Sequence, residues 1–536
     1  MRMVDSIVTA EEPSEDSMKA VSSQDTDPLS GEPSVRASSP LLGSVAEELA
    51  TRYKHCSADY TTVFTWFSKS LSAALFMFFA TLFSTVALGA HIQIATDNRI
   101  GLSEYLVMNS IAGVAHSLVG TQPLLIIRPT GPITAILTKL CTLADSLKVD
   151  LFQLLAATGI CVSILMFAIA FSGFARHIQR LTPFVHEIFA CFVCSIYLHD
   201  GISDVHARFV HDSLASFGVS LFDLNLALIV FGLSIKLQGA REWRFFPASV
   251  RILVSDYAVT IAVVTATLIS YSVDSFASAE VLRIRLPDAF APSLSVSDIS
   301  RPWYAASLST AAPSTWLTAA AAAVPISFFF YMDQGISSLL CQLPELGLTR
   351  GAYYHSSFAA LGVLNFIGPL FGCPFVTGSL PHSPQFVRAL STKRPDGSIH
   401  VAESRVTPFI VYLMIGMPLL APRLIKAIPE AAIDGVLMFV GYEGIVCTGL
   451  WDRVLLSMTP KYDDHFPPAM RAIRATRVRQ YTAIQLALFA LCWLVNLSPF
   501  GLGVAFIIVG LVPLRERILP RIFTTAELRV LDAPRA

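Results

Sequence analysis

Two stretches decide the fold of this chain: LVGTQPLLIIRPTGP at residues 118–132 and GCPFVTGSLPHSPQFVRALS at residues 372–391. Each is apolar enough to enter a membrane, yet each contains prolines and glycines, which break α-helices. An unwound backbone survives in a bilayer only where protein or a water-filled cavity satisfies its polar groups. Paired interruptions in matching positions are typical of inverted-repeat transporters with a midplane site. The alternative is two kinked helices packed on their neighbours, because proline and glycine are common in membrane spans.

The composition around these stretches is that of a membrane protein. Of 536 residues, 54% are hydrophobic and 14% charged, with a mean hydropathy of +0.60, whereas soluble domains carry about 25% charged residues. The net charge of −1 gives no reason to expect a nucleic-acid partner. The nine cysteines are scattered without the spacing of a zinc site, so we expect no metal centre and no cofactor.

Apolar runs separated by short polar breaks predict an all-α polytopic membrane protein. A bilayer core of about 30 Å requires about 20 apolar residues per helix. The unbroken runs and the broken stretches at 122–140 and 374–390 give about fourteen membrane segments. Each broken stretch is the third of the seven segments in its half of the chain. The sequence thus predicts a seven-plus-seven inverted repeat with two half-helices. The unbroken runs are 67–90, 104–118, 151–172, 185–198, 221–235, 253–271, 316–340, 358–371, 408–421, 433–446, 481–495 and 502–519.

Polar segments divide the chain further. Lys and Arg gather in alternate loops, for example around Arg241 and Arg477, and the positive-inside rule then places both termini in the cytosol. The first residues are acidic and rich in Ser and Pro, which indicates disorder. We expect a multi-pass protein of the plasma membrane with a disordered acidic cytosolic tail (1–55), a first inverted repeat (56–276), an extracellular loop (277–312), a second inverted repeat (313–523) and a cytosolic C-terminal tail (524–536).

Polar residues at the two interruptions form the candidate substrate and ion site. If two half-helices face each other with their N-terminal ends, their free N–H groups and dipoles favour an anion. No redox or nucleophile constellation is present, so we expect no catalytic residue. The candidates supply hydroxyls, imidazole and close backbone approach: Gln122, Thr130 and Gly131 from the first stretch, and Thr377, Gly378, Ser379, His382 and Ser383 from the second.

Charged residues inside apolar runs are costly and mark functional sites. Asp333, in SFFFYMDQGISSLL, could bind a cation such as Na⁺, carry a proton or pair with a base; the structural alternative is a pair with a buried arginine. Arg128 is the candidate charge partner, and it could neutralise Asp333, hold an anion or snorkel to a surface. His382 either couples to protons or hydrogen-bonds at a helix end.

Ordered blocks along the chain resemble the bicarbonate and borate transporter family, solute carrier family four. That family contains anion exchangers, sodium-coupled bicarbonate carriers and borate exporters. The resemblance runs from about Thr51 to the C-terminus. Beside the two stretches quoted above, it is carried by FYMDQGISSLL at 330–340, IPEAAIDGVLMFVGYEGI at 428–445, WDRVLLSMTPKY at 451–462 and VPLRERILPRIFTTAELRVLDA at 512–533.

The resemblance implies seven-plus-seven inverted repeats, with a core domain that holds substrate and moves like an elevator and a gate domain that forms a homodimer. Asp333 looks like the acidic residue on the eighth helix, where Asp is similar to sodium-coupled and borate-type members. His382 falls where red-cell-type exchangers have Arg, and LPHSP is similar to borate-type sequences. Arg128 departs from the small or apolar residue usual there. The subgroup leans towards borate.

These observations predict a secondary active transporter or exchanger of a small inorganic anion, borate or bicarbonate, coupled to H⁺, OH⁻ or Na⁺. An electrogenic transporter of H⁺, OH⁻ or ammonia is the alternative within the same class. A membrane enzyme is the remote alternative, because the loops show no catalytic triad, metal motif or phosphate-binding glycine-rich arrangement.

Overall fold

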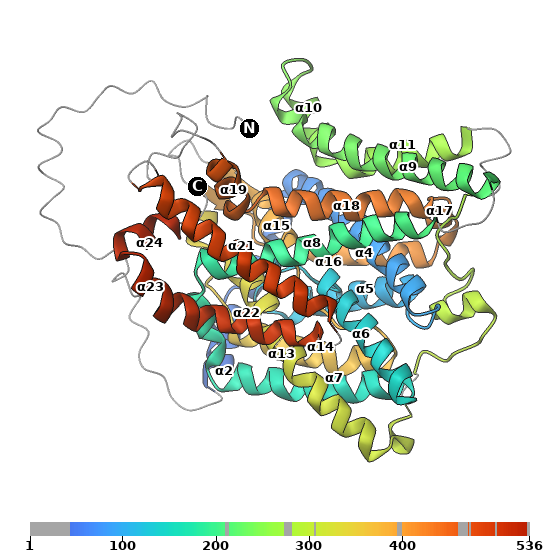
Figure 1. Ribbon diagram of the computed structural model, residues 1–536, viewed down its shortest axis with the longest axis horizontal. Helices are drawn as coiled ribbons and strands as arrows, with labels where there is room; N and C mark the ends of the chain where they lie inside the picture. The colour runs from blue at the N-terminus through green and yellow to red at the C-terminus, as the bar shows by residue number, and fades with distance from the viewer. Residues whose placement is uncertain are drawn as a thin grey trace, which may run out of the picture.

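The computed structural model describes residues 43–209, 214–272, 281–304, 307–393, 399–458, 470, 473–498 and 501–532. Within these residues long helices lie side by side, and only two short sheets interrupt them (Figure 1). Helix α7 (Leu151–Phe171) shows how the sequence sets an element: Asp150 caps it by accepting a 2.8 Å hydrogen bond from the Gln153 N–H, and an uninterrupted apolar run follows.

Six helices in the described residues are long and apolar enough to cross a membrane, or up to eight if each of two bent pairs is one span. This measure leaves the expected fourteen segments untested, because short, bent and half-length helices such as α6 (Gly131–Leu147) and α15 (His382–Leu390) do not meet it. The six are Phe67–Ala95 (α4), Leu151–Phe171 (α7), Pro183–Ala207 (α8), Phe217–Glu242 (mostly α9), Pro313–Cys341 (α13) and Ala475–Leu497 (α21), and the bent pairs are Ala248–Asp256 with Ala258–Ser272 (α10, α11) and Glu430–Val446 with Gly449–Met458 (α18, α19).

The helices pack in two groups. In the first, α7 lies along α14 (His355–Leu370) and α13, while α5 (Leu102–Val119) and α16 (Val406–Gly416) pack together on α4. In the second, α18 packs between α8 and α9, and α11 covers α9. We call these groups the core group and the gate group. Shorter elements complete the chain: α3 (Cys56–Thr65), α17 (Pro422–Lys426), α22 (Val504–Pro513), α23 (Leu519–Ile522), β3 (Ser391–Lys393) and β4 (Ile399–Val401).

Both proline- and glycine-rich stretches are broken within the core group. After α5 the chain unwinds, forms the two-residue strand β1 (Ile127–Arg128) and starts α6 (Gly131–Leu147), with proline in the first turn. After α14 it likewise forms β2 (Thr377–Gly378) and starts α15 (His382–Leu390). The two strands pair antiparallel. The prediction of two half-helices is confirmed, and the kinked-helix alternative is wrong.

The predicted terminal tails contain ordered helices. Helix α2 (Gly43–Tyr53) lies inside the stretch expected to be disordered, so that expectation is wrong for residues 43–53, and residues 1–42 lie outside the described part. The cause is Glu48, whose carboxylate accepts hydrogen bonds of 2.8–3.1 Å from three N–H groups at the start of α14. At the other end, α24 (Thr525–Leu531) carries a capping box between Thr524 and Glu527.

Candidate functional site

The strand pair brings the starts of α6 and α15 together. Ile127 lies opposite Gly378, and Arg128 lies opposite Thr377. The Ser379 N–H donates a 2.7 Å hydrogen bond to the Ile126 carbonyl, which extends this pairing by one bond. We call the paired residues 126–128 and 377–379 the ladder. Two helix N-terminal ends from opposite halves of the chain therefore converge at one place inside the protein. This is the geometry that concentrates positive potential for an anion.

Two glycines permit the close packing around the ladder. The Gly378 N–H donates to the Gln334 side-chain oxygen at 2.7 Å, and its carbonyl accepts from the Ser337 hydroxyl at 2.7 Å. A Cβ atom at Gly378 would lie 2.8 Å from the Ser337 Cβ, which is too close for any other residue. Gly131 is similarly confined, because its Cβ would lie 2.5 Å from the ring of Tyr197 on α8. The Gly131 N–H donates to the Tyr197 hydroxyl at 2.7 Å, so a residue of the gate group closes the start of α6.

Asp333 lies beside the ladder on α13. Its side chain is 2% exposed, and the Thr130 hydroxyl donates to its carboxylate at 3.4 Å. The Thr377 hydroxyl approaches the same carboxylate but forms no hydrogen bond of good geometry with any described residue. One threonine from each half of the chain therefore faces the carboxylate.

The Arg128 side chain lies between the ladder and α4. It is 1% exposed, and it donates to the Thr81 carbonyl at 3.1 Å and to the Ser84 hydroxyl. Its burial rules out snorkelling. Arg128 and Asp333 influence each other electrostatically but form no ion pair, and the Arg128 Nε has no partner among the described residues. The guanidinium is therefore a buried cation whose charge has no directly contacting carboxylate.

His382 and Ser383 begin α15. The His382 Nδ1 lies 2.8 Å from the Ser379 hydroxyl, which gives it the hydrogen-bonding position at a helix end. The Ser383 hydroxyl accepts from the Ile126 N–H at 3.1 Å and donates to the Ser379 carbonyl at 2.8 Å. Both side chains are buried and tie the start of α15 to β1. Proton coupling through His382 stays a prediction.

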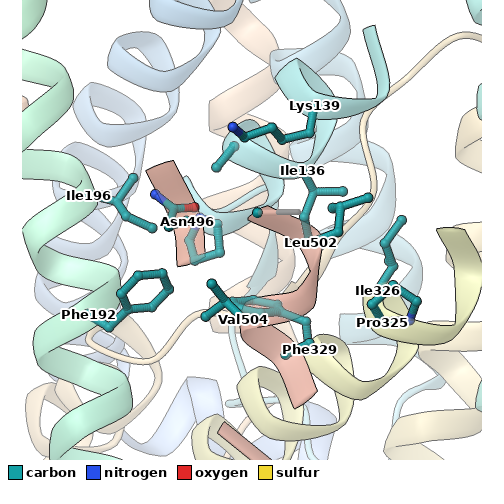
Figure 2. Close-up of a pocket in the computed structure, with 14 residues that line it drawn as sticks. Ile136, Lys139, Phe192, Ile196, Pro325, Ile326, Phe329, Asn496, Leu502 and Val504 are labelled. Atoms are coloured by element: carbon teal, nitrogen blue, oxygen red, sulfur yellow. The ribbon is translucent and has the colours of Figure 1, made fainter. Parts of the chain in front are cut away.

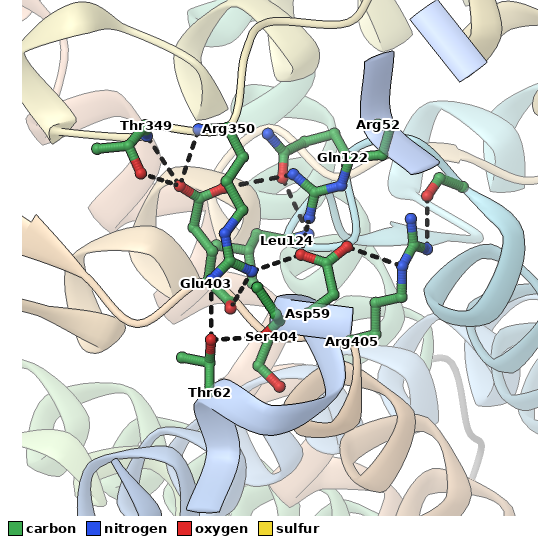
Figure 3. Close-up of polar contacts among 12 residues, drawn as sticks. Arg52, Asp59, Thr62, Gln122, Leu124, Thr349, Arg350, Glu403, Ser404 and Arg405 are labelled. Atoms are coloured by element: carbon green, nitrogen blue, oxygen red, sulfur yellow. Dashed lines mark hydrogen bonds and ion pairs between the residues drawn. The ribbon is translucent and has the colours of Figure 1, made fainter. Parts of the chain in front are cut away.

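Gln122 lies apart from the other candidates. Its amide contacts Gln342, at the end of α13, at 3.5 Å and the Leu124 N–H at 3.4 Å. Figure 3 places it beside Arg52 and Arg350, in a polar cluster at the far end of the unwound segment. The structure thus brings the remaining predicted residues to the ladder and leaves Gln122 outside it.

That polar cluster holds the start of the broken segment, where α5 ends. Asp59 on α3 binds Arg52 at 2.7 Å, Arg350 at 2.5 Å and Arg405 at 3.0 Å (Figure 3). Arg405 also donates to the carbonyls of residues 117, 118 and 120, where α5 ends and the chain unwinds. Glu403 completes the set by binding Arg52 at 3.5 Å. We call Arg52, Asp59, Arg350, Glu403 and Arg405 the Asp59 cluster.

Sequence reasoning missed several residues that shape the site. Gln334 and Ser337 were visible as polar positions beside Asp333 in one apolar run, and their spacing places both on the helix face that meets β2. Tyr197 and Tyr412 gave no such signal; the Tyr412 hydroxyl accepts from the Ile127 N–H at 2.9 Å. Among the described residues, no three His, Cys, Asp or Glu side chains gather as metal ligands.

Comparison with known proteins connects this geometry to a family. The family model described as "HCO3- transporter integral membrane domain" matches residues 40–217 and 210–536. Anion exchange protein 3 of Mus musculus is 24% identical over 535 residues, covering 92% of this chain and 43% of that protein. Band 3 anion transport protein of Homo sapiens is 24% identical over 523 residues, covering 92% and 56%. The chain thus spans about half the length of the curated relatives it matches.

Solved structures share the fold at low sequence identity. The transmembrane domain of the cyanobacterium bicarbonate transporter BicA aligns with a TM-score of 0.50 and 17% identity, over 82% of this chain and 98% of that one. The murine Solute Carrier 26 family member A9 anion transporter, in its inward-facing state, gives 0.56 and 15%, over 97% and 76%. The inverted-repeat fold expected from the sequence is therefore confirmed.

Proposed function

Because this multi-pass membrane chain belongs to the family of HCO₃⁻ transporter integral membrane domains, we propose that it is a secondary transporter or exchanger of a small inorganic anion. The observation that carries the proposal is the strand pair, which aims the N-terminal ends of α6 and α15 at one buried place. The relatives named above are called anion exchange and anion transport proteins, which supports the same class.

The charges around the ladder suit an anion that binds together with a counter-charge. Arg128 supplies a buried positive charge, and the two helix ends add partial positive charge. Asp333 supplies a buried negative charge, held near Thr130 and Thr377. A small oxyanion between these groups would meet hydroxyl donors from both halves. A proton or Na⁺ at Asp333 would offset the repulsion between the carboxylate and the anion.

The same proposal extends to the finer features of the transporter. We assign Thr130, Gly131, Thr377, Gly378 and Ser379 to the substrate site, with His382 and Ser383 fixing the start of α15. Borate or bicarbonate is the substrate, and the LPHSP sequence with Asp333 favours the borate branch. The core group carries the anion and the gate group forms a homodimer. Both termini face the cytosol and the protein lies in the plasma membrane, with inverted repeats at 56–276 and 313–523.

Flux measurements in proteoliposomes test the proposal. Purified protein is assayed with borate, bicarbonate, chloride and Na⁺ varied separately, with a pH dye inside and the membrane potential clamped. We expect saturable flux of at least one of these anions. A current that follows pH and ignores every anion would favour the H⁺, OH⁻ or ammonia alternative. Folded protein that carries neither anions nor protons would contradict both transporter hypotheses and would favour the membrane-enzyme alternative.

Replacing Asp333 by asparagine tests the coupling role. The amide has the shape of the carboxyl but no charge, so it imitates a carboxyl that already holds its proton or cation. We expect Asp333→Asn to keep anion flux and to lose its dependence on an imposed pH or Na⁺ gradient, while Asp333→Glu keeps that dependence. The readout is uptake with and without each gradient. Unchanged coupling in the asparagine variant would remove Asp333 from the mechanism.

A further inference from the structure

A histidine joins the core group to the gate group near the ends of two long helices. His91 lies on α4 of the core group, and its Nδ1 is 2.6 Å from the Asp204 carboxylate on α8 of the gate group. Its Nε2 is 3.7 Å from the carboxylate of Asp200, about one turn earlier on α8. Each of the three side chains is 17% exposed, so the contact is mostly buried but within reach of water.

In the proposed topology this contact faces the outside of the cell. Asn98, shortly after the end of α4, donates a 3.1 Å hydrogen bond to the Ser297 hydroxyl. The Glu430 N–H, at the start of α18, donates to the Leu282 carbonyl at 2.9 Å. Both acceptors belong to the segment between α11 and α13, which is extracellular in the topology proposed above. The pH that His91 meets is therefore that of the outer solution.

Both ring nitrogens of His91 face a carboxylate. A neutral imidazole carries one N–H, whereas the protonated ring donates from both nitrogens, and an ionised carboxylate only accepts. The arrangement therefore suits the protonated ring, which bonds to Asp204 and attracts Asp200 at the same time. A neutral ring keeps at most one of these interactions and carries no charge to offset the carboxylates.

The helices around His91 bring five carboxylates together, which we call the outer acidic cluster. Asp204 interacts electrostatically with both carboxylates of α18, and one of these, Asp434, also acts on His91. One oxygen of Asp223 is buried without a hydrogen-bond partner among the described residues, so the cluster is not fully satisfied. The cluster consists of Asp200 and Asp204 on α8, Asp223 on α9, and Glu430 and Asp434 on α18.

Few positive charges offset this cluster. Arg208 is shared by two of the five carboxylates, at 2.5 and 3.3 Å, and Arg285 acts on a third. His199 lies 3.3 Å from another, but it is 52% exposed and belongs to the same helix as that carboxylate. Asp204 takes its hydrogen bond from His91. Loss of the charge on His91 therefore leaves Asp204 among other carboxylates, and like charges at close range repel each other.

Away from His91, part of the interface of the core group is apolar. A cavity of about 30 Å³ separates α6 and α13 from α8, α21 and α22 (Figure 2). Apart from Lys139 and Asn496, the residues that line it are apolar or glycine. Attraction between apolar surfaces has no preferred direction, so this part of the interface permits sliding. A charged hydrogen bond such as that of His91 instead fixes one relative position of the two groups.

We propose that His91 and Asp204 form an outer pH switch: protonated His91 holds the core group against the gate group, and loss of its proton releases the core group for transport. The inference rests on the proposed anion transport, in which the core group carries the anion, and adds a site where outer protons regulate it. The contact is complete at low outer pH and is lost as the outer pH rises, so transport increases with outer pH. His91 sets the rate of transport, whereas Asp333 is assigned to its coupling.

Transport by His91→Gln at different outer pH values tests the proposal. The assay uses cells, in which all molecules have one orientation, with the inner pH held constant. The outer pH is varied between about 5.5 and about 9.5, a range that includes the ordinary titration of histidine near 6.5. We expect flux through the unaltered protein to rise about tenfold with outer pH, because a hydrogen bond to a charged group shifts an equilibrium by roughly that factor. His91→Gln should be fast at every outer pH.

Two further variants control this experiment. His91→Arg carries a permanent charge, so its flux should be slow at every outer pH. His199→Gln is the matched control, because His199 also lies beside a carboxylate of the outer acidic cluster but does not connect the two groups. Its response should equal that of the unaltered protein, and comparison at each pH removes any effect of pH on the anion itself. An unchanged response in His91→Gln, or an equal loss of response in His199→Gln, would overturn the inference.

Thermal unfolding in detergent separates this inference from the function on which it rests. We expect the unaltered protein to melt at a higher temperature than His91→Gln at low pH, and this difference to shrink as the pH rises. If His91→Gln does not fold, Asp204→Asn removes the same contact from the gate side. A pH-dependent difference in a protein without anion flux under any condition would overturn the proposed function and leave the pH-sensitive contact standing. Anion flux without such a difference would overturn the switch.

Discussion

Arg128→Gln is expected to reduce anion transport strongly at sub-saturating anion concentrations without destabilising the protein. The guanidinium is 1% exposed and has no directly contacting carboxylate, so a bound anion is the partner that would compensate its charge. Removing one member of a buried charge pair costs about 3–5 kcal/mol, and each 1.4 kcal/mol is a tenfold change in affinity. We therefore expect transport to fall by about 100-fold or more.

The stability of the same variant distinguishes anion binding from a structural role. Arg128 also donates to the Thr81 carbonyl and the Ser84 hydroxyl, so it could act mainly by fastening β1 to α4. If Arg128 binds the anion, its charge is unpaired when the anion is absent. Removing that charge then leaves the melting temperature of the anion-free protein constant or raises it. If it fastens β1, flux and melting temperature fall together, and that result would contradict the proposal.

Two further variants complete the Arg128 experiment. Arg128→Lys keeps the charge but loses the planar fork of donors, so we expect partial transport with weaker discrimination between planar and spherical anions. Arg388→Gln is the matched control, because Arg388 is exposed at the opposite end of α15. Its flux should equal that of the unaltered protein. Radiotracer or boron uptake, with thermal unfolding followed in parallel, measures all three.

The site could be predicted from the sequence wherever the signal is local. Prolines and glycines marked both broken spans, and a carboxylate inside an aromatic run marked Asp333. The pairing register of β1 with β2 depends on contacts between residues about 250 positions apart, such as Ile127 with Gly378. No local pattern encodes such a register. The same holds for Tyr197, whose hydroxyl reaches Gly131 only because α8 packs against the start of α6.

The ends of the fold were harder to predict for a related reason. Residues 43–53 follow an acidic, proline-rich stretch, and in isolation they bury too little apolar surface to fold. Glu48 changes the balance by capping α14, which lies some 300 residues further along the chain. Helix length alone does not identify the half-helices, because α15 has nine residues and cannot cross a bilayer alone.

Asp59→Asn is expected to destabilise the protein more than Asp333→Asn or Arg128→Gln. Asp59 is 0% exposed and binds Arg52, Arg350 and Arg405, which are themselves 1%, 15% and 5% exposed. An asparagine would leave these buried guanidinium groups facing a neutral amide. Breaking a buried pair costs about 3–5 kcal/mol because the remaining charge has lost its partner. The melting temperature in detergent should therefore drop strongly.

The position of the Asp59 cluster predicts which segments lose their structure first in Asp59→Asn. Arg405 holds the carbonyls of residues 117, 118 and 120 only while Asp59 orients it, and these carbonyls end α5 just before the unwound segment. We expect hydrogen exchange in Asp59→Asn to rise first in α2, α3 and residues 118–126, and later at the ladder. Asp145→Asn is the matched control, because its bond to Arg99 is exposed and contributes little. Equal melting temperatures in the two variants would show that the cluster does not anchor the broken span.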